Sequence, residues 1–151
     1  MIIQGGLAHV TDSVSSERFL RFIAGEVPNS LFFVVEAPPG IAMTAAIDWR
    51  VVVPDAAAVA ALAEALWKGY ETFVQPLQSN KGTAGAGIRI QIKNEKGAFD
   101  QFMLGKDITE QALFCQRLEE STKILSPKDR KKAFLLELEQ TRSSDYWEEL
   151  T

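Results

Sequence analysis

The sequence predicts an α+β fold, with a mixed or antiparallel sheet and helices mainly on one face. Strand-like and helix-like segments alternate in the order β-α-β-β-α-β-β-α-α, and the first six are compatible with a ferredoxin-like core. The 151 residues suit one domain, and no linker divides them. A hydrophobic share of 46% and a charged share of 24% are ordinary for a globular chain.

The first helix and strands are indicated by apolar spacing. Residues 1–10 predict a strand, and a helix capped by Asp12 or Ser13 follows to about Ala24. The apolar positions of that helix recur at helical spacing: Phe19, Leu20, Phe22 and Ile23. Residues 31–35 are apolar and rich in aromatic and β-branched types, which indicates a buried strand.

The middle of the chain predicts a strand followed by a buried helix. Residues 45–53 alternate between apolar and charged side chains, as a half-buried strand does. Asp55 is the expected N-cap of a helix that ends before Pro76. Its first turns are apolar on all sides, so we expect a helix buried on all sides. Residues 31–35 and 56–66 should therefore form the centre of the core.

The next segment predicts a hairpin and then a third helix. Residues 79–87 form a glycine-containing loop, and residues 88–92 alternate as a strand. A turn at 94–97 leads to a partner strand over 98–104. Asp107 and Glu110 resemble a capping box, which starts a helix that runs to about Leu125.

The C-terminal segment, residues 127–151, predicts a helix and a tail. Proline at 127 suits the first helical position after a serine cap. The predicted apolar side of this helix is Phe134, Leu135 and Leu138. Tyr146 and Trp147 follow it, and either dock on the domain or anchor a partner.

Composition excludes several classes of function. The formal net charge of −4 and the pI near 5.1 give no attraction to a phosphate backbone, so no nucleic acid is expected. No apolar run reaches the roughly 20 residues of a membrane span, so no membrane is expected either. Cys115 is the only cysteine, which rules out an internal disulfide and a thiolate zinc site. We therefore expect a cytoplasmic protein.

The sequence offers few candidates for catalysis. His9 and Cys115 lack matching partners nearby, and both suit structural positions. Glu36 and Asp48 lie on neighbouring predicted strands and could act together on a proton or a metal. The alternative is that Asp48 pairs with Arg50 or Arg89 across the sheet.

The glycines at 82–87 do not form a phosphate loop. They lead into a strand, whereas a phosphate cradle leads into a helix N-terminus. The lysine and hydroxyl residue that close a P-loop are also missing. No cofactor and no catalytic residue are expected.

Residues 16–118 resemble the effector-associated constant component domains of bacterial conflict systems. The matching features, in chain order, are the cluster Arg18-Phe19-Leu20-Arg21-Phe22, the strand and turn Val34 to Gly40, the alanine-rich helix Ala56 to Trp67, and the hairpin Ile88 to Leu104. This chain has Ile41-Ala42-Met43 where the family turn carries another glycine. The resemblance implies a non-enzymatic module that couples effector and trigger proteins, with no catalytic residue to carry over.

The sequence thus favours a non-enzymatic protein-interaction or adaptor module, in a conflict or signalling system. Its partner is another protein or a second copy, and the expected contact residues are Phe134, Leu138, Tyr146 and Trp147. One alternative is an immunity protein, because an acidic chain can neutralise a basic toxin. Another is a small enzyme that uses Glu36 and Asp48.

Overall fold

The computed structural model describes residues 1–10, 13–27, 31–36, 47–93, 99–120, 127–144 and 147–150, without the side chains of 13, 36, 47, 99 and 127–130. The predicted turn at 94–97, the end of the third predicted helix and Tyr146 lie outside these residues. The strands are β1 (Ile2–Ala8), β2 (Leu31–Glu36), β3 (Ile47–Val52), β4 (Gly87–Lys93), β5 (Phe99–Leu104) and β6 (Glu148–Glu149). The α-helices are α1 (Ser13–Glu26), α2 (Ala56–Gly69), α3 (Gln111–Glu120) and α4 (Pro127–Arg142).

The described strands form a six-stranded antiparallel sheet in the order β5-β4-β1-β3-β2-β6. Its four central strands, β4-β1-β3-β2, have α1 after β1 and α2 after β3. This is the arrangement of a ferredoxin-like β-α-β-β-α-β core. The predicted α+β class and the predicted core order are both confirmed.

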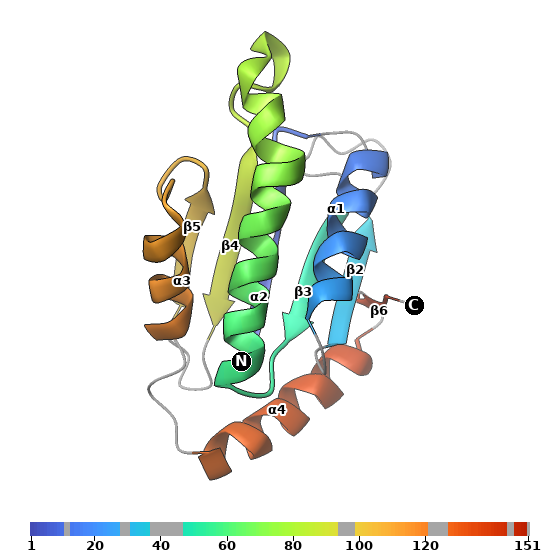
Figure 1. Cartoon of the computed structure of the whole chain (residues 1–151). Coiled ribbons are helices and arrows are strands. Elements are labelled where there is room, and N and C mark those ends of the chain that lie inside the picture. Colours follow the sequence, from blue (N-terminus) through green and yellow to red (C-terminus); the bar gives the residue numbers. More distant parts are fainter. Residues whose placement is uncertain are drawn as a thin grey trace.

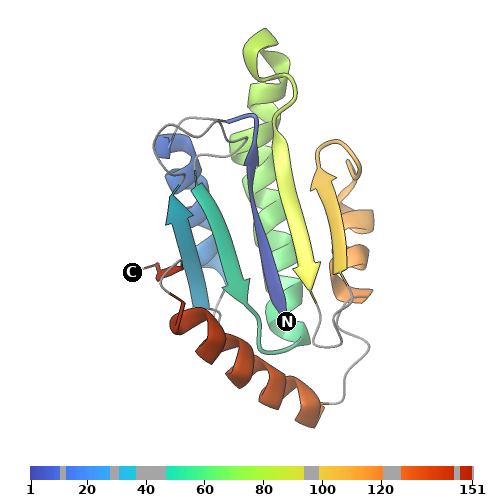
Figure 2. The same cartoon turned by 180° about the vertical axis from the view of Figure 1, so that it is seen from behind.

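The helices are divided unequally between the two faces of the sheet. Helices α1, α2 and α3 lie side by side over one face, while α4 lies across one end of the sheet (Figure 1). Seen from behind, the opposite face carries α4 only along its lower end (Figure 2). We call this second face the open face. The predicted placement of the helices, mainly on one face, agrees with this arrangement.

The main core lies between the sheet and α1 to α3. Leu62 and Leu66 of α2 are fully buried, as are Trp49 and Val51 of β3. A Cβ atom on Gly69 would lie 2.7 Å from the ring of Phe19, so a glycine lets α1 approach α2 closely. The expected core segments are confirmed in part, because Phe32 belongs to this core whereas Phe33 faces the other side.

Helix α2 begins where it was predicted to begin, but it differs from the prediction in the burial of its first turn and in its C-terminal end. Asp55 caps it by accepting a hydrogen bond from the backbone N–H of Ala58 at 2.8 Å, as expected. Ala56 and Ala57 are exposed, so the helix is not buried on all sides. Small alanine side chains suit a solvent face as well as a core, which apolar patterning alone does not distinguish. After Gly69 the chain continues as a π-helical turn (Tyr70–Val74) and two 3-10 turns (Gln75–Ser79 and Lys81–Thr83).

The start of α3 was predicted too early. Helix α3 begins at Gln111, and Asp107 does not cap it. The carboxylate of Asp107 instead accepts a hydrogen bond from the backbone N–H of Met103 at 2.8 Å. An aspartate side chain closes a turn as readily as it caps a helix, and here the turn after β5 takes it.

Helix α4 packs against the open face of the sheet. Leu138 joins Phe33 and Val52 in a second apolar cluster, against which Leu31, Phe134 and Trp147 are partly buried. Its predicted apolar side is wrong at Leu135, which is 54% exposed. The buried residues Glu137, Leu138 and Thr141 centre the inner face of α4 near Phe134. Leu135 lies about 100° around the helix from Phe134, at the edge of that face, so it is turned toward solvent. Within the described residues, no helix is long and apolar enough to cross a membrane.

Candidate functional site

A row of polar side chains crosses the open face of the sheet. The register places Gln101 opposite Gln91, Gln91 opposite Gln4, and Gln4 opposite Arg50. Gln4 donates a hydrogen bond from its amide to the Oε1 atom of Gln91 at 2.9 Å. Residues directly opposite on antiparallel strands are close enough to interact, which explains this contact. The sheet thus has an apolar face toward α1 to α3 and a polar centre on its open face.

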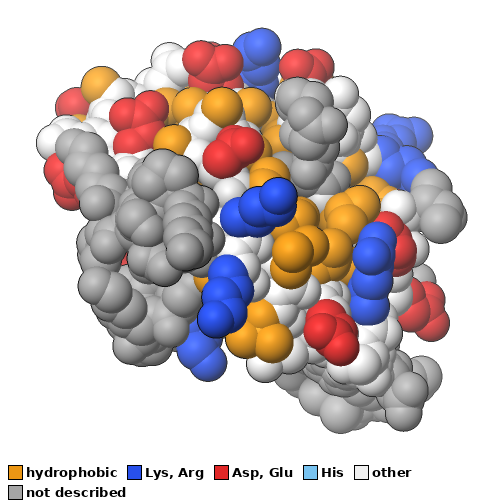
Figure 3. Space-filling view, turned by 90° about the horizontal axis from the view of Figure 1, so that it is seen from below, with side chains coloured by type: hydrophobic (Ala, Val, Ile, Leu, Met, Phe, Trp, Pro, Cys, Tyr) orange, Lys and Arg blue, Asp and Glu red, His pale blue; other side chains and the backbone are white. Residues whose placement is uncertain are grey.

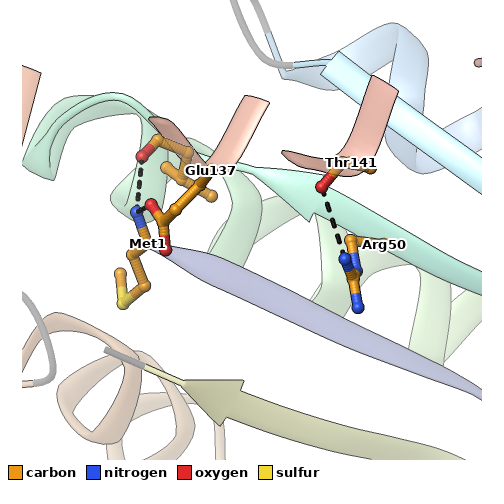
Figure 4. Close-up of polar contacts among 5 residues, drawn as sticks. Met1, Arg50, Glu137 and Thr141 are labelled. Atoms are coloured by element: carbon orange, nitrogen blue, oxygen red, sulfur yellow. Dashed lines mark hydrogen bonds and ion pairs between the residues drawn. The ribbon is translucent and has the colours of Figure 1, made fainter. Parts of the chain in front are cut away.

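Arg50 connects this row to the C-terminal segment. Its Nε and Nη2 atoms both donate to Oε1 of Gln4, at 3.1 and 2.9 Å. Its Nη1 atom donates to the hydroxyl of Thr141 on α4 at 3.3 Å, as Figure 4 shows. The guanidinium lies 4.6 Å from the ring centre of Trp147, in a cation–π contact. Burial lowers the pKa of Arg50, and the charge of Glu137 partly opposes that shift.

A second contact joins α4 to the end of β1. The amino group of Met1 lies 2.6 Å from Oε1 of Glu137 and 3.2 Å from the carbonyl oxygen of Val53 (Figure 4). Glu137 is 9% exposed, so its charge needs such a partner. These polar contacts and the second apolar cluster fix the inner side of α4 on the sheet.

Asp48 and Arg89 form an ion pair across strand β1. Their strands are not neighbours, and the register places Gly6 between them. Because Gly6 has no side chain, the Nη2 atom of Arg89 reaches Oδ1 of Asp48 at 3.0 Å. Burial raises the pKa of Asp48, although the charge and hydrogen bond of Arg89 act in the opposite direction. The desolvation of this carboxylate is therefore only partly compensated.

A comparison with a second ion pair shows what the Arg89 pair lacks. Arg117 donates from both Nε and Nη2 to the two oxygens of Asp100, at 2.9 and 2.6 Å. Arg89 uses Nη2 alone toward Asp48, and among the described residues its buried Nε atom has no hydrogen-bond partner. Buried donors without partners are rare in native proteins, and each requires an explanation.

The ion pair lines a small cleft on the open face. Its volume is about 150 Å³, and its lining residues are Gln4, Gly5, Asp48, Trp49, Arg89, Gln91 and Trp147. Pockets for drug-sized ligands measure roughly 300–1,000 Å³. The volume corresponds to about five water molecules at roughly 30 Å³ each, which suits one small polar group.

The outer side of α4 carries an exposed apolar pair. Leu135 and Leu136 are 54% and 55% exposed. Lys131 and Lys132 lie one turn before them and are also exposed. We call these four residues the outer patch. Seen from below, this end of the molecule shows hydrophobic side chains gathered between Lys and Arg side chains (Figure 3).

Three of the four residues predicted to bind a partner pack on the molecule itself, and the fourth lies outside the described residues. Phe134, Leu138 and Trp147 pack on the molecule's own sheet, so the expected docking of Trp147 is observed. Their predicted role toward a partner stays a prediction, as does that of Tyr146, which lies outside the described residues. Leu136 was missed, because four apolar residues in a row hide which ones face outward.

The candidate catalytic residues are placed as follows. Asp48 lies opposite Val35 in the register and binds Arg89, as one sequence alternative predicted. The side chain of Glu36 lies outside the described residues, so the enzyme alternative stays a prediction. His9 follows β1 with a φ of 60°. Cys115 packs against the main core, and burial raises the pKa of its thiol, which disfavours the reactive thiolate.

The side chains on the described part of the open face are mainly hydrogen-bond donors. Among the described residues, no group of three or more His, Cys, Asp or Glu side chains is placed to hold a metal ion. The open face instead offers hydrogen-bond donors, two arginines and an indole ring, which are groups that recognise a polar or anionic ligand. The arrangement is suited to binding.

Comparison with protein-family models, with curated proteins and with solved structures finds no match to this chain. The adaptor, immunity-protein and enzyme hypotheses therefore all stay predictions, as does the resemblance to conflict-system domains.

Proposed function

We propose that this chain is a non-enzymatic protein-interaction module whose contact surface is the outer patch of α4. The observation that carries the proposal is the exposure of Leu135 and Leu136, which lie side by side and are each more than half exposed. A single exposed leucine is ordinary, whereas an adjacent pair on a helix flanked by charges is typical of an interaction surface.

The inner side of the same helix supports this proposal. Leu138 and Thr141 hold α4 on the sheet through the second cluster and through Arg50. The outer patch is thus presented on a fixed helix, so little conformational entropy is lost when a partner binds. The resemblance to effector-associated constant component domains points in the same direction, because those domains are thought to couple other proteins without catalysis.

The charges of α4 favour a second copy of this chain as the partner. The exposed leucines have Lys131 and Lys132 one turn before them, and Glu139, also exposed, one turn after Leu135. In an antiparallel pairing of two α4 helices centred on the leucines, Lys132 of one copy would face Glu139 of the other. A two-fold interface needs a surface that is complementary to itself, and this helix meets that condition.

The test is the oligomeric state of two matched double variants. Leu135→Glu/Leu136→Glu should make the chain monomeric at all concentrations in analytical ultracentrifugation. Val14→Glu/Leu113→Glu is the control, because those side chains are 55% and 53% exposed on α1 and α3 and the change in charge is the same. The control should self-associate like the original chain.

Charge reversal tests the orientation of the pairing. Lys132→Glu alone should weaken self-association by roughly threefold to tenfold, the size expected of an ion pair at a partly desolvated interface. Adding Glu139→Lys should restore it, because both opposed charges are then exchanged. A chain that is monomeric before any substitution, or a double reversal that restores nothing, would show that the patch does not join two copies.

A further inference from the structure

The cleft on the open face is lined by hydrogen-bond donors that have no acceptor in the described part of the chain. Among the described residues, Arg89 Nε has no acceptor, and the amide nitrogen of Gln91 makes no hydrogen bond either. Both residues lie on β4 two positions apart, so both side chains leave the same face of the strand. By contrast, Gln4 and Arg50 are hydrogen-bonded to each other. The lining of the cleft therefore includes N–H donors that lack an acceptor among the described residues.

The charges around the cleft have the sign opposite to that of the whole chain. The chain carries a formal net charge of −4. Among the described residues, Arg50 and Arg89 lie beside the cleft with the carboxylate of Asp48, while the carboxylate of Glu137, whose charge acts on Arg50, is paired with the amino group of Met1. In a partly buried site this local excess of positive charge attracts an anion.

The guanidinium of Arg89 makes a single hydrogen bond to Asp48, through Nη2, and its Nε–H lacks an acceptor among the described residues. Arg117 shows the hydrogen bonding that an arginine makes when a carboxylate can approach it side-on, because its Nε and Nη2 atoms both donate to Asp100. Asp48 approaches Arg89 from two strands away, across Gly6, and reaches only Nη2. A group with two acceptor oxygens could bind Nε of Arg89 and the amide of Gln91 at once.

We propose that this cleft is a binding site for one carboxylate group, held by Arg89 and Gln91 beside the indole of Trp147. The volume of about 150 Å³ matches the size of a small carboxylate or of the end of an acidic side chain. The carboxylate comes either from a free small acid or from an acidic residue of a partner protein. The site lies on β1, β3 and β4 with Trp147 of the C-terminal tail beside it, and none of the outer-patch residues lines it, so it does not depend on self-association through that patch.

The site is tested by nuclear magnetic resonance on the full, ¹⁵N-labelled chain. Sodium acetate and a capped hexaglutamate peptide are the probes, and sodium chloride at the same ionic strength is the control. Both carboxylate probes should shift the Nε–H signal of Arg89 and the amide signals of Gln91 until they saturate. Chloride should not do so. If hexaglutamate binds far more tightly than acetate, an acidic protein segment is the source of the carboxylate, and equal affinity per carboxylate indicates a free acid.

Variants decide whether the cleft or general surface charge binds the probes. Arg89→Lys keeps the charge but loses the Nε donor, and should weaken binding of both probes by roughly tenfold or more, the effect of one lost charge-assisted hydrogen bond. Arg21→Gln removes one positive charge from an exposed pair on α1, far from the cleft residues in sequence, and should leave binding unchanged. Equal losses in both variants would overturn the proposal.

A third variant keeps the test valid if Arg89→Lys disturbs the fold. Gln91→Glu is nearly the same size and supplies a carboxylate from within the chain, next to the unpartnered donor. It should abolish acetate binding and move the Arg89 Nε–H signal in the same direction as saturating acetate. Unaltered acetate binding in Gln91→Glu would mean that acetate binds outside the cleft, which would overturn the proposal.

Discussion

At the scale of single residues, two aspartates with arginine partners have opposite electrostatic balances. Asp48 is bound by one arginine nitrogen, and its burial outweighs that contact. Asp100 is bound by two nitrogens of Arg117 and is more exposed, so its hydrogen bonds outweigh its burial. The same pair of residue types therefore moves the carboxyl pKa upward at one site and downward at the other.

The first prediction concerns these two pKa values. In a ¹³C-detected titration, Asp48 should titrate above the ordinary value of 3.8 and Asp100 below it. The raised pKa of Asp48 stabilises the fold most below the unfolded pKa, and that contribution is lost as pH rises through the folded pKa. The lowered pKa of Asp100 has the reverse effect, since its contribution is present above the unfolded pKa and is lost as pH falls through the folded pKa. Both carboxyls titrating on the same side of 3.8 would contradict the balance described.

At the scale of elements, strand β1 needs glycine where it passes between β3 and β4. A Cβ atom on Gly5 would collide with the carbonyl oxygen of Arg89, and would lie 3.2 Å from the ring of Trp49. By contrast, a Cβ atom on Gly25 in α1 would meet no heavy atom within 4 Å. Gly25 also lacks the positive φ of a helix-ending glycine, and α1, which was predicted to run to about Ala24, continues to Glu26.

The second prediction compares alanine at these two positions. Gly5→Ala should lower the free energy of unfolding by at least about 2 kcal/mol, because backbone cannot move away as a flexible side chain can. Gly25→Ala should raise it by up to roughly 0.5–1 kcal/mol, because alanine favours a helix over glycine. Urea unfolding followed by tryptophan fluorescence measures both. A harmless Gly5→Ala would mean that β1 does not pass so close to β4.

Much of the element order could be predicted from the sequence, for a physical reason. Alternation in residues 88–92 and the cap at Asp55 are local signals, and the structure reproduces both. The cleft could not be predicted, because Arg89 and Asp48 are 41 positions apart and meet only when β1 lies between their strands. The two-residue strand β6 was also missed, since its pairing with β2 depends on how α4 directs the chain.

At the scale of the whole molecule, α4 is the helix that covers the lower end of the open face (Figure 2). Without it, Phe33 and Val52 would lose their cover, and Arg50 would lose Thr141. The main core on the other face includes none of the described side chains of α4. The sheet thus has one self-sufficient face and one face that depends on the C-terminal segment.

The last prediction is that deleting residues 127–151 leaves a folded but weaker domain. Burying a large apolar side chain contributes about 1.5–3 kcal/mol, so exposing the second cluster should cost roughly 3–5 kcal/mol of unfolding free energy. Small domains have only about 5–15 kcal/mol in total, so the truncated chain should fold yet unfold at clearly lower urea. Its exposed apolar face should bind a hydrophobic dye that the intact chain does not bind.

This deletion and the substitutions on the outer patch together distinguish the role of the inner side of α4 from that of its outer side. The deletion should reduce both stability and self-association, because it removes the inner and outer sides together. Leu135→Glu/Leu136→Glu should reduce self-association alone, since neither side chain belongs to the second cluster. A large loss of stability in that double variant would mean that the leucines support the fold, and α4 would then be only a cover for its own sheet. An unchanged urea midpoint after the deletion would instead contradict the packing of Leu138 on Phe33 and Val52.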